Sequence, residues 1–288
     1  MSVHYCGRDF SAAEIERIRR CMAASPQANR SALSRMVCEE LDWRRADGRL
    51  KDMSCRVAML RMESDGLIVL PPPQKRNANG QPYRRRTEAA EPELFPVLEP
   101  VHALRDLHLE LVEGRPASHL WNEYVDRYHY LGYRPLGGDQ LRYFARSGHQ
   151  VLGALGFGAA AWKTAVRDEF IGWDATQRQS RLHLVVNNAR FLILPWVRSQ
   201  NLASCLLAMA SRHLADDWQT RYGYRPVLLE TFVETPRFRG TCYKAANWLE
   251  LGRTRGRGKW DVRNIAPLSR KTVWVYPLSA NFHQLLCG

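Results

Sequence analysis

The sequence predicts an α/β protein with two parts, an N-terminal winged helix-turn-helix and a larger mixed α/β domain. Three observations support this class. Residues 1–72 contain three short amphipathic segments that follow helix-capping or turn residues. Residues 73–100 are rich in proline and charge and are expected to be a linker. Residues 101–288 alternate helical patterns with short apolar runs, an order typical of a mixed sheet covered by helices.

The composition favours a cytoplasmic protein that binds nucleic acid. Its 288 residues carry 42 Lys and Arg against 29 Asp and Glu, a formal net charge of +13, which favours an acidic partner. No apolar run is long enough to span a bilayer, so no membrane partner is expected. The seven cysteines form no C-x-x-C pair, and the histidines do not recur at ligand spacing. We therefore expect reduced cysteines and no bound metal.

The N-terminal module begins with a capping box, in which Ser11 is followed three residues later by Glu14. A second helix is capped by Asn29 or Ser31. A third helix is predicted over 51–64, where apolar side chains recur at helical spacing and an Asp-Gly turn follows.

The apolar run 67–70 predicts a short strand after the third helix, and this order is typical of a winged helix-turn-helix. Its last helix would present Lys51, Arg56 and Arg61 to a DNA groove. The alternative is a small helical module that binds another protein, because the net charge of this region is low.

The stretch 73–100 contains few residues that could build a core. Its proline run favours polyproline II, and the basic run 84–86 suits phosphate contacts without sequence preference. Some apolar side chains near its end are expected to pack onto the following domain: Leu94, Phe95, Val97 and Leu98.

The C-terminal domain is organised around 189–214, an apolar strand followed by a sharp break and an amphipathic helix. A bulge is expected at Asn187 and Asn188, and the polar stretch 163–181 is expected to cover a site as a lid. Helices are predicted at 101–113, 117–130, 202–222 and 240–249. Strands are predicted at 141–146, 150–157, 181–194, 226–233 and 271–277.

This order of elements resembles the GNAT acyltransferase fold, in which a turn before a helix holds the pyrophosphate of acyl-coenzyme A. The family signature Arg/Gln-x-x-Gly-x-Gly/Ala is matched here by Arg198-Ser-Gln-Asn201-Leu-Ala203. The resemblance implies a cofactor contact through Arg198, Asn201, Ala203 and Ser204. Asn201 stands where the family has glycine, which weakens the implication of acyl-coenzyme A.

A second resemblance covers most of the chain. The segments YHYLG (128–132), RDEFIGW (167–173), LVVNNARFLILPWV (184–197), GTCYKAANWLELGRTRGRGK (240–259) and GRLKDMSCRVAMLRMESDGLIVLPPP (48–73) are similar to the DruA-like family of prokaryotic proteins. That family includes a component of the Druantia anti-phage system and members found near transposon genes. The resemblance implies a setting of phage defence or mobile DNA and does not imply a reaction.

Three residues are candidates for catalysis. In the GNAT-like frame, Glu230 at a strand end would be a general base, and Tyr243 in the next helix would be an acid. His129, followed by Tyr130, would supply a base beside a stacking platform. The alternatives are an ion pair of Glu230 with an arginine, packing of the Tyr243 ring, and a structural histidine.

Two groups of residues are candidates for nucleic-acid contacts. The first group comes from the lid and the bulged strand and consists of Arg167, Asn187 and Arg190. The second belongs to 237–271, which holds ten basic and two acidic residues, and consists of Arg237, Arg239, Arg253, Arg255, Arg257 and Lys259. The alternatives are a strand bulge satisfied by its own polar side chains and a solvated basic loop.

The leading hypothesis is a DNA-binding protein of a defence or mobile-element system that acts on or holds nucleic acid through its GNAT-like domain. A nucleic-acid-modifying transferase is one version of it. One alternative is an adaptor without catalytic activity that recruits a helicase or transposase. Another is a DNA nicking or strand-transfer enzyme.

Overall fold

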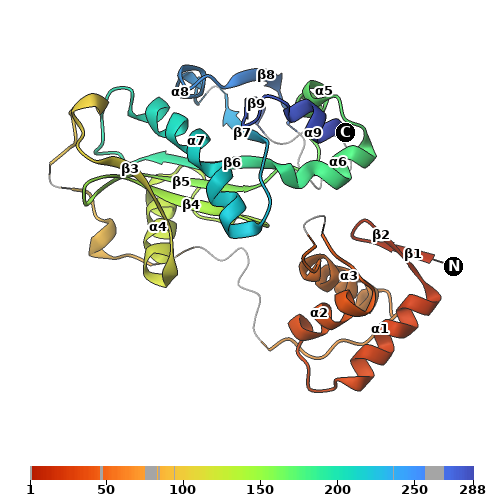
Figure 1. The fold of residues 1–288 in the computed structure, drawn as a ribbon. Coiled ribbons are helices and arrows are strands. Elements are labelled where there is room, and N and C mark those ends of the chain that lie inside the picture. Colours follow the sequence, from red (N-terminus) through yellow and green to blue (C-terminus); the bar gives the residue numbers. More distant parts are fainter. Residues whose placement is uncertain are drawn as a thin grey trace. The chain divides into compact units, whose positions relative to one another are not determined.

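The computed structural model describes residues 2–45, 48–74, 83, 85–93, 95–235, 237–256 and 269–288. The chain divides into two compact units, Met1–Asn79 and Gly80–Gly288, and each is described by itself (Figure 1). Two residues of the predicted basic run, Arg257 and Lys259, lie outside the described residues.

The first unit contains a β-hairpin that is followed along the chain by three helices. The hairpin pairs β1 (Ser2–Tyr5) with β2 (Arg8–Ser11), and the helices are α1 (Ala12–Ala24), α2 (Arg30–Glu40) and α3 (Asp52–Ser64). The capping box at the start of α1 is confirmed. Asn29, and not Ser31, caps α2, because its side chain accepts the N–H groups of Ser31 and Ala32.

The predicted strand at 67–70 is wrong. Ile68 and Leu70 are buried in the core of this unit, but the backbone bonds to side chains and not to a strand. The Leu70 N–H donates to the Glu63 carboxylate, and the Leu67 carbonyl accepts from Arg19. The hairpin of this unit precedes the helices, so the winged helix-turn-helix is not confirmed.

The second unit is built on a mixed sheet of seven strands, in the order β3-β4-β5-β6-β7-β9-β8 (Figure 1). Neighbouring strands are antiparallel except β6 and β7, which are parallel. The strands are β3 (Leu107–Leu111), β4 (Leu141–Ser147), β5 (Gln150–Ala159), β6 (Val185–Ile193), β7 (Leu228–Glu234), β8 (Leu249–Arg253) and β9 (Lys271–Pro277). The helices are α4 (Gly114–Tyr128), α5 (Ala165–Ile171), α6 (Ala175–Arg181), α7 (Leu202–Tyr222), α8 (Thr241–Ala245) and α9 (Phe282–Cys287).

Most of the predicted elements of this unit are confirmed, and α7 and β9 have the predicted bounds. The helix expected at 101–113 is wrong, because Leu107, Leu109 and Leu111 alternate along the edge strand β3. Strand β8 and helix α9 were not predicted.

Helices α4 and α7 cover opposite faces of the sheet. Successive residues of a strand point to opposite faces, and in β4 Arg142 bonds to Asn122 of α4 while the Tyr143 hydroxyl donates to Asp217 of α7. On the α4 face, the Trp121 ring lies directly over Gly156, where a Cβ would be 2.9 Å from the ring. The glycine therefore lets α4 approach the sheet closely.

The parallel pair β6 and β7 holds together over three residue pairs only, from Val185–Leu228 to Asn187–Glu230. Strand β6 also has a bulge here, at Ala189. This residue lies between the β6 partners of Gly156 and Phe157, where the register with β5 shifts. The bulge was predicted one residue earlier. The two parallel strands therefore separate beyond Asn187 and open a space between their carboxyl-terminal halves.

Residues 86–100, which were predicted to be linker, pack against the second unit. The Thr87 N–H and hydroxyl both donate to Glu123, a fully buried residue of α4, at 2.6 and 3.0 Å. Ala90 is fully buried, and Val97 forms a β-bridge with Val197. Of the apolar residues expected to pack here, Val97 does so, Phe95 and Leu98 are exposed, and Leu94 lies outside the described residues.

Among the residues that the structure describes, no helix combines the length and apolarity that crossing a membrane requires.

We predict that Glu123→Ala lowers the free energy of unfolding by about 2–4 kcal/mol, because the Thr87 N–H and Arg127 lose their buried acceptor. Denaturant unfolding measures the change, and Glu88→Ala at an exposed position is the control. Equal effects of the two variants would show that docking of 86–100 does not depend on Glu123.

Candidate functional site

A cavity of about 590 Å³ opens where β6 and β7 separate. Its walls come from these two strands, the end of α4, the start of α8 and the segment before α8. Six of the predicted site residues line it: His129, Asn187, Arg190, Arg237, Arg239 and Tyr243. Lys271, the first residue of β9, adds a further cation.

Tyr243 lines this space and bridges the two strands. Its hydroxyl donates to the Asn188 side-chain oxygen on β6 at 2.8 Å and accepts from the Thr231 hydroxyl on β7 at 3.5 Å. Burial raises the pKa of Tyr243 above its ordinary value. The phenol is therefore a neutral bridge between the separating strands.

His129 is a neutral hydrogen-bond donor in the cavity wall. The Leu131 N–H donates to its Nδ1 at 3.2 Å, which leaves the ring proton on Nε2. Burial, together with the charges of Arg190 and Arg237, lowers the pKa of His129 from 6.5 to about 4.

Two buried polar atoms in this wall have no partner within the described part of the chain: the Arg190 Nε and the Asn187 Oδ1. Burial also lowers the pKa of Arg190, which indicates a guanidinium short of counter-charge. An unpaired buried polar group costs free energy, so these atoms are suited to a ligand that bonds to them.

The mouth of the cavity carries an aromatic and cationic stack that the sequence predicted only in part. The Arg237 guanidinium carbon lies 4.7 Å from the centre of the Tyr130 ring, and the Phe238 ring lies 5.1 Å from Tyr130. Phe238 is 44% exposed, so part of its ring is open to a ligand. Its position between Arg237 and Arg239 is the signal that could have identified it.

Glu230 does not line the cavity. It is fully buried, with one carboxylate oxygen 2.9 Å from the buried guanidinium of Arg167 and the other accepting the Ala161 N–H at 2.8 Å. Burial raises the pKa of Glu230, and Arg167 opposes this. We therefore correct both assignments: this ion pair holds α5 to the sheet, and neither side chain reaches the cavity.

The turn expected to bind acyl-coenzyme A agrees with the resemblance in its backbone conformation but not in its hydrogen bonds. Asn201 has a left-handed backbone, with φ of 64°, and so replaces glycine in conformation. However, the Arg198 N–H donates to the Val97 carbonyl, and the Gln200 carbonyl accepts from Val101. A chain segment thus lies along the turn and takes backbone groups that would face the pyrophosphate, so the residues present do not fit this cofactor.

The other predicted contact residues lie elsewhere. Arg253 and Arg255 are exposed on and after β8 and do not line the cavity. Ala203 and Ser204 form the first turn of α7. The three residues of the first unit are on or beside α3, where Arg61 is exposed and Arg56 bonds to the Ser31 hydroxyl and pairs with Asp52.

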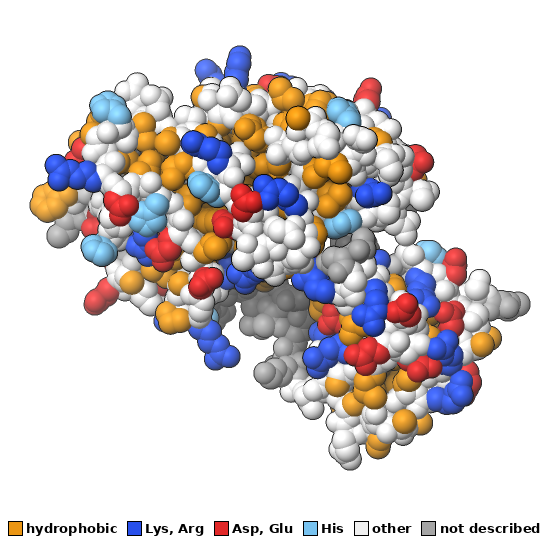
Figure 2. Space-filling model, viewed as in Figure 1, with side chains coloured by type: hydrophobic (Ala, Val, Ile, Leu, Met, Phe, Trp, Pro, Cys, Tyr) orange, Lys and Arg blue, Asp and Glu red, His pale blue; other side chains and the backbone are white. Residues whose placement is uncertain are grey.

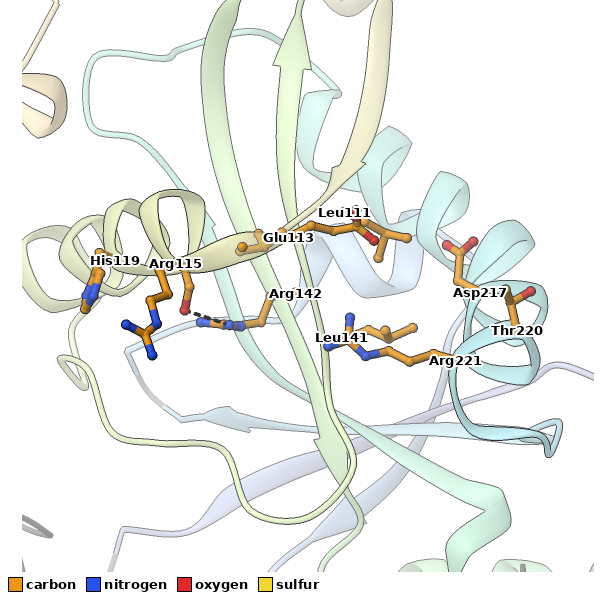
Figure 3. A pocket seen from close by; sticks show the side chains of 12 residues that line it. Leu111, Glu113, Arg115, His119, Leu141, Arg142, Asp217, Thr220 and Arg221 are labelled. Atoms are coloured by element: carbon orange, nitrogen blue, oxygen red, sulfur yellow. Dashed lines mark hydrogen bonds between the residues drawn. The ribbon is translucent and has the colours of Figure 1, made fainter.

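A second cavity, of about 820 Å³, lies between the start of α4, strand β4 and the end of α7. In Figure 3, the side chains of His119, Arg115, Arg142 and Arg221 follow one another in a row along it. The sequence did not point to this cavity, and two carboxylates, Glu113 and Asp217, also line it. The first cavity has more unpaired cations and the predicted residues, so we take it as the candidate site.

In the parts of the chain that the structure describes, no group of His, Cys, Asp or Glu side chains could hold a metal ion.

Comparison with known proteins gives one family and a set of similar folds. The model of the family described as Druantia protein DruA matches residues 61–267. No curated protein matches the sequence. Similar solved structures include the ribosomal-protein-S18-alanine N-acetyltransferase of Escherichia coli, with 13% identity, a TM-score of 0.38 and coverage of 60% of this chain and 94% of that one.

Two further structures are a spermidine N-acetyltransferase chimera from Vibrio cholerae and an N-acyl amino acid synthase from uncultured soil microbes. The first has 10% identity and a TM-score of 0.40, covering 60% of this chain and 95% of that one. The second has 12% identity and a TM-score of 0.35, covering 60% and 90%. At such identities and TM-scores, these structures imply nothing about activity.

We predict that Glu230→Leu lowers the free energy of unfolding by about 3–5 kcal/mol, because the buried Arg167 loses one of its two carboxylate partners and keeps only Asp168. The double variant Arg167→Met/Glu230→Leu is expected to recover most of this loss. Denaturant unfolding of the wild type, the single variant and the double variant measures both changes in the free energy of unfolding. A Glu230→Leu protein of unchanged stability would refute the structural role of the pair.

We also predict that His129 titrates near pH 4 by NMR, and that Arg237→Ala raises this pKa toward 6.5. Because the folded state binds this proton less readily than the unfolded state, acidification from pH 6.5 to 4 reduces stability. The same titration of Arg212→Ala, a change at an exposed site on α7, is the control. A wild-type pKa near 6.5 would contradict the site as described.

Proposed function

The chain belongs to the Druantia protein DruA family, and on that premise we propose that it is a nucleic-acid-binding protein that holds an unpaired stretch of DNA in the cavity between β6 and β7. The family resemblance supports, as part of this proposal, a setting of prokaryotic anti-phage defence or mobile DNA. A cavity of about 590 Å³ has the size of a small-molecule site. It suits a nucleotide lifted out of a strand and is too small for a duplex.

The observation that carries the proposal is the set of unpaired cations at this cavity. None of Arg190, Arg237, Arg239 and Lys271 forms an ion pair with a described residue. Arginines beside a negative ligand lower its charge and fix its position, and phosphates are the ligands they most often bind.

The aromatic side chains at the mouth favour nucleic acid over a small anion. Tyr130 and Phe238 present ring faces beside Arg237, and bases stack on such faces without regard to sequence. The unpaired Asn187 Oδ1 is suited to accept a hydrogen bond from a base edge. Acyl transfer is the weaker candidate, because a chain segment is bonded along the turn that would hold the pyrophosphate of acyl-coenzyme A.

For the first unit we propose a role in binding a partner protein, for example a helicase or transposase of the same system, in preference to DNA docking through α3. The outer side of α3 exposes Met53, Val57 and Leu60 at spacings of four and three residues. Arg56 is already bonded within the unit. On the face of this unit that Figure 2 shows, acidic and basic side chains are interspersed, which does not favour a polyanion there.

We predict that the protein binds single-stranded oligo-dT and that Phe238→Ala weakens binding by about 1–3 kcal/mol, roughly 5- to 150-fold in Kd. Arg237→Ala is expected to weaken binding and to reduce the slope of log K against log salt by about one. Fluorescence anisotropy across a salt series measures both.

Arg212→Ala, at an exposed position outside the cavity, is the matched control and is expected to retain wild-type affinity. Binding that is indifferent to salt and to Arg237 would overturn the proposed function.

A further inference from the structure

Tyr130 lies among groups that are suited to phosphoryl transfer. It follows α4 directly and lines the cavity, and its ring contacts those of His129 at 4.8 Å and Phe238 at 5.1 Å. The Arg237 guanidinium lies over its face at 4.7 Å. The two other tyrosines that line the cavity are bonded within the fold, because the Tyr128 hydroxyl donates to the Ala90 carbonyl and Tyr243 is bonded to both strands. Among the described residues, Tyr130 is therefore the tyrosine placed to meet a ligand.

The charges around Tyr130 are of both signs. Burial and then the charge of Glu234 raise the pKa of Tyr130, while the charges of Arg190 and Arg237 lower it. Glu234 is the one carboxylate among the described residues that line the cavity, and it is the acceptor available for the phenol proton. Arg190 and Arg237 are close enough to influence both the phenol and His129.

We propose, resting on nucleic-acid binding at this cavity, that Tyr130 is the nucleophile of a phosphodiester exchange on the bound strand. The Tyr130 oxygen forms a bond to phosphorus while the bond from phosphorus to one deoxyribose oxygen breaks. Glu234 takes the phenol proton and returns it to the leaving oxygen. One phosphodiester replaces another, so no oxidant, reductant or other co-reactant is consumed.

The remaining side chains match the needs of that step. The charge that develops on the phosphoryl oxygens is met by the guanidinium groups of Arg190 and Arg237. His129 adds a neutral N–H donor through Nε2. The unpaired Arg190 Nε is a donor that no described residue of the free protein uses.

The test uses thymidine 5′-(p-nitrophenyl phosphate), which carries a good leaving group and needs no target sequence. The wild-type protein is expected to release one equivalent of p-nitrophenolate in a burst and to gain one thymidylyl group on Tyr130, found by intact-mass and peptide mass spectrometry. Tyr130→Phe should reduce the burst rate at least 100-fold and should gain no thymidylyl group.

Tyr133→Phe is the matched control, because this tyrosine is three residues further along, half-buried and outside the cavity. It should keep the wild-type burst. An adduct that persists in Tyr130→Phe, or oligo-dT binding by the wild type without any adduct, would overturn this inference and leave nucleic-acid binding intact. Failure of the wild type to bind oligo-dT would instead overturn the proposed function.

Discussion

The parallel pairing of β6 and β7 ends after three residue pairs, and the candidate site depends on this early end. Had the strands remained paired, Asn188 and Thr231 would be bonded across the sheet, and no cavity would exist between them. Instead the bulge at Ala189 turns β6 away, and the Tyr243 hydroxyl joins the two side chains where the strands part. The end of α4 then supplies His129 and Tyr130 to the opened edge.

The charges of two arginines in the second unit, Arg167 and Arg190, are compensated to different degrees. Arg167 is fully buried and has carboxylate partners in Glu230 and Asp168, so its charge is compensated within the fold. Arg190 is partly buried, lacks such a partner among the described residues, and keeps an unbonded Nε. The first arrangement stabilises the fold. The second arrangement costs free energy of folding, because a buried charge lacks a partner, and a bound anion offsets that cost. This contrast separates the structural arginine from the functional one.

The sequence predicted those elements whose own residues determine them. Helix α7 and strand β9 carry clear periodic patterns, and the capping box of α1 is local. The conformations of 67–70 and 86–100 could not be predicted, because Arg19 and Glu123, which bond to them, lie far away in the chain. Of the three catalytic candidates, Tyr243 and His129 line one cavity. Glu230 is held away from it by an ion pair with Arg167, which the positions of the two residues in the sequence do not indicate.

The most direct test of the account is a crystal structure of the protein with a short oligo-dT. We expect one phosphate between Arg190 and Arg237 and one base against the Phe238 ring, beside Tyr130. An oligonucleotide bound along α3, or in the second cavity beside Arg142, with the first cavity unchanged, would contradict it.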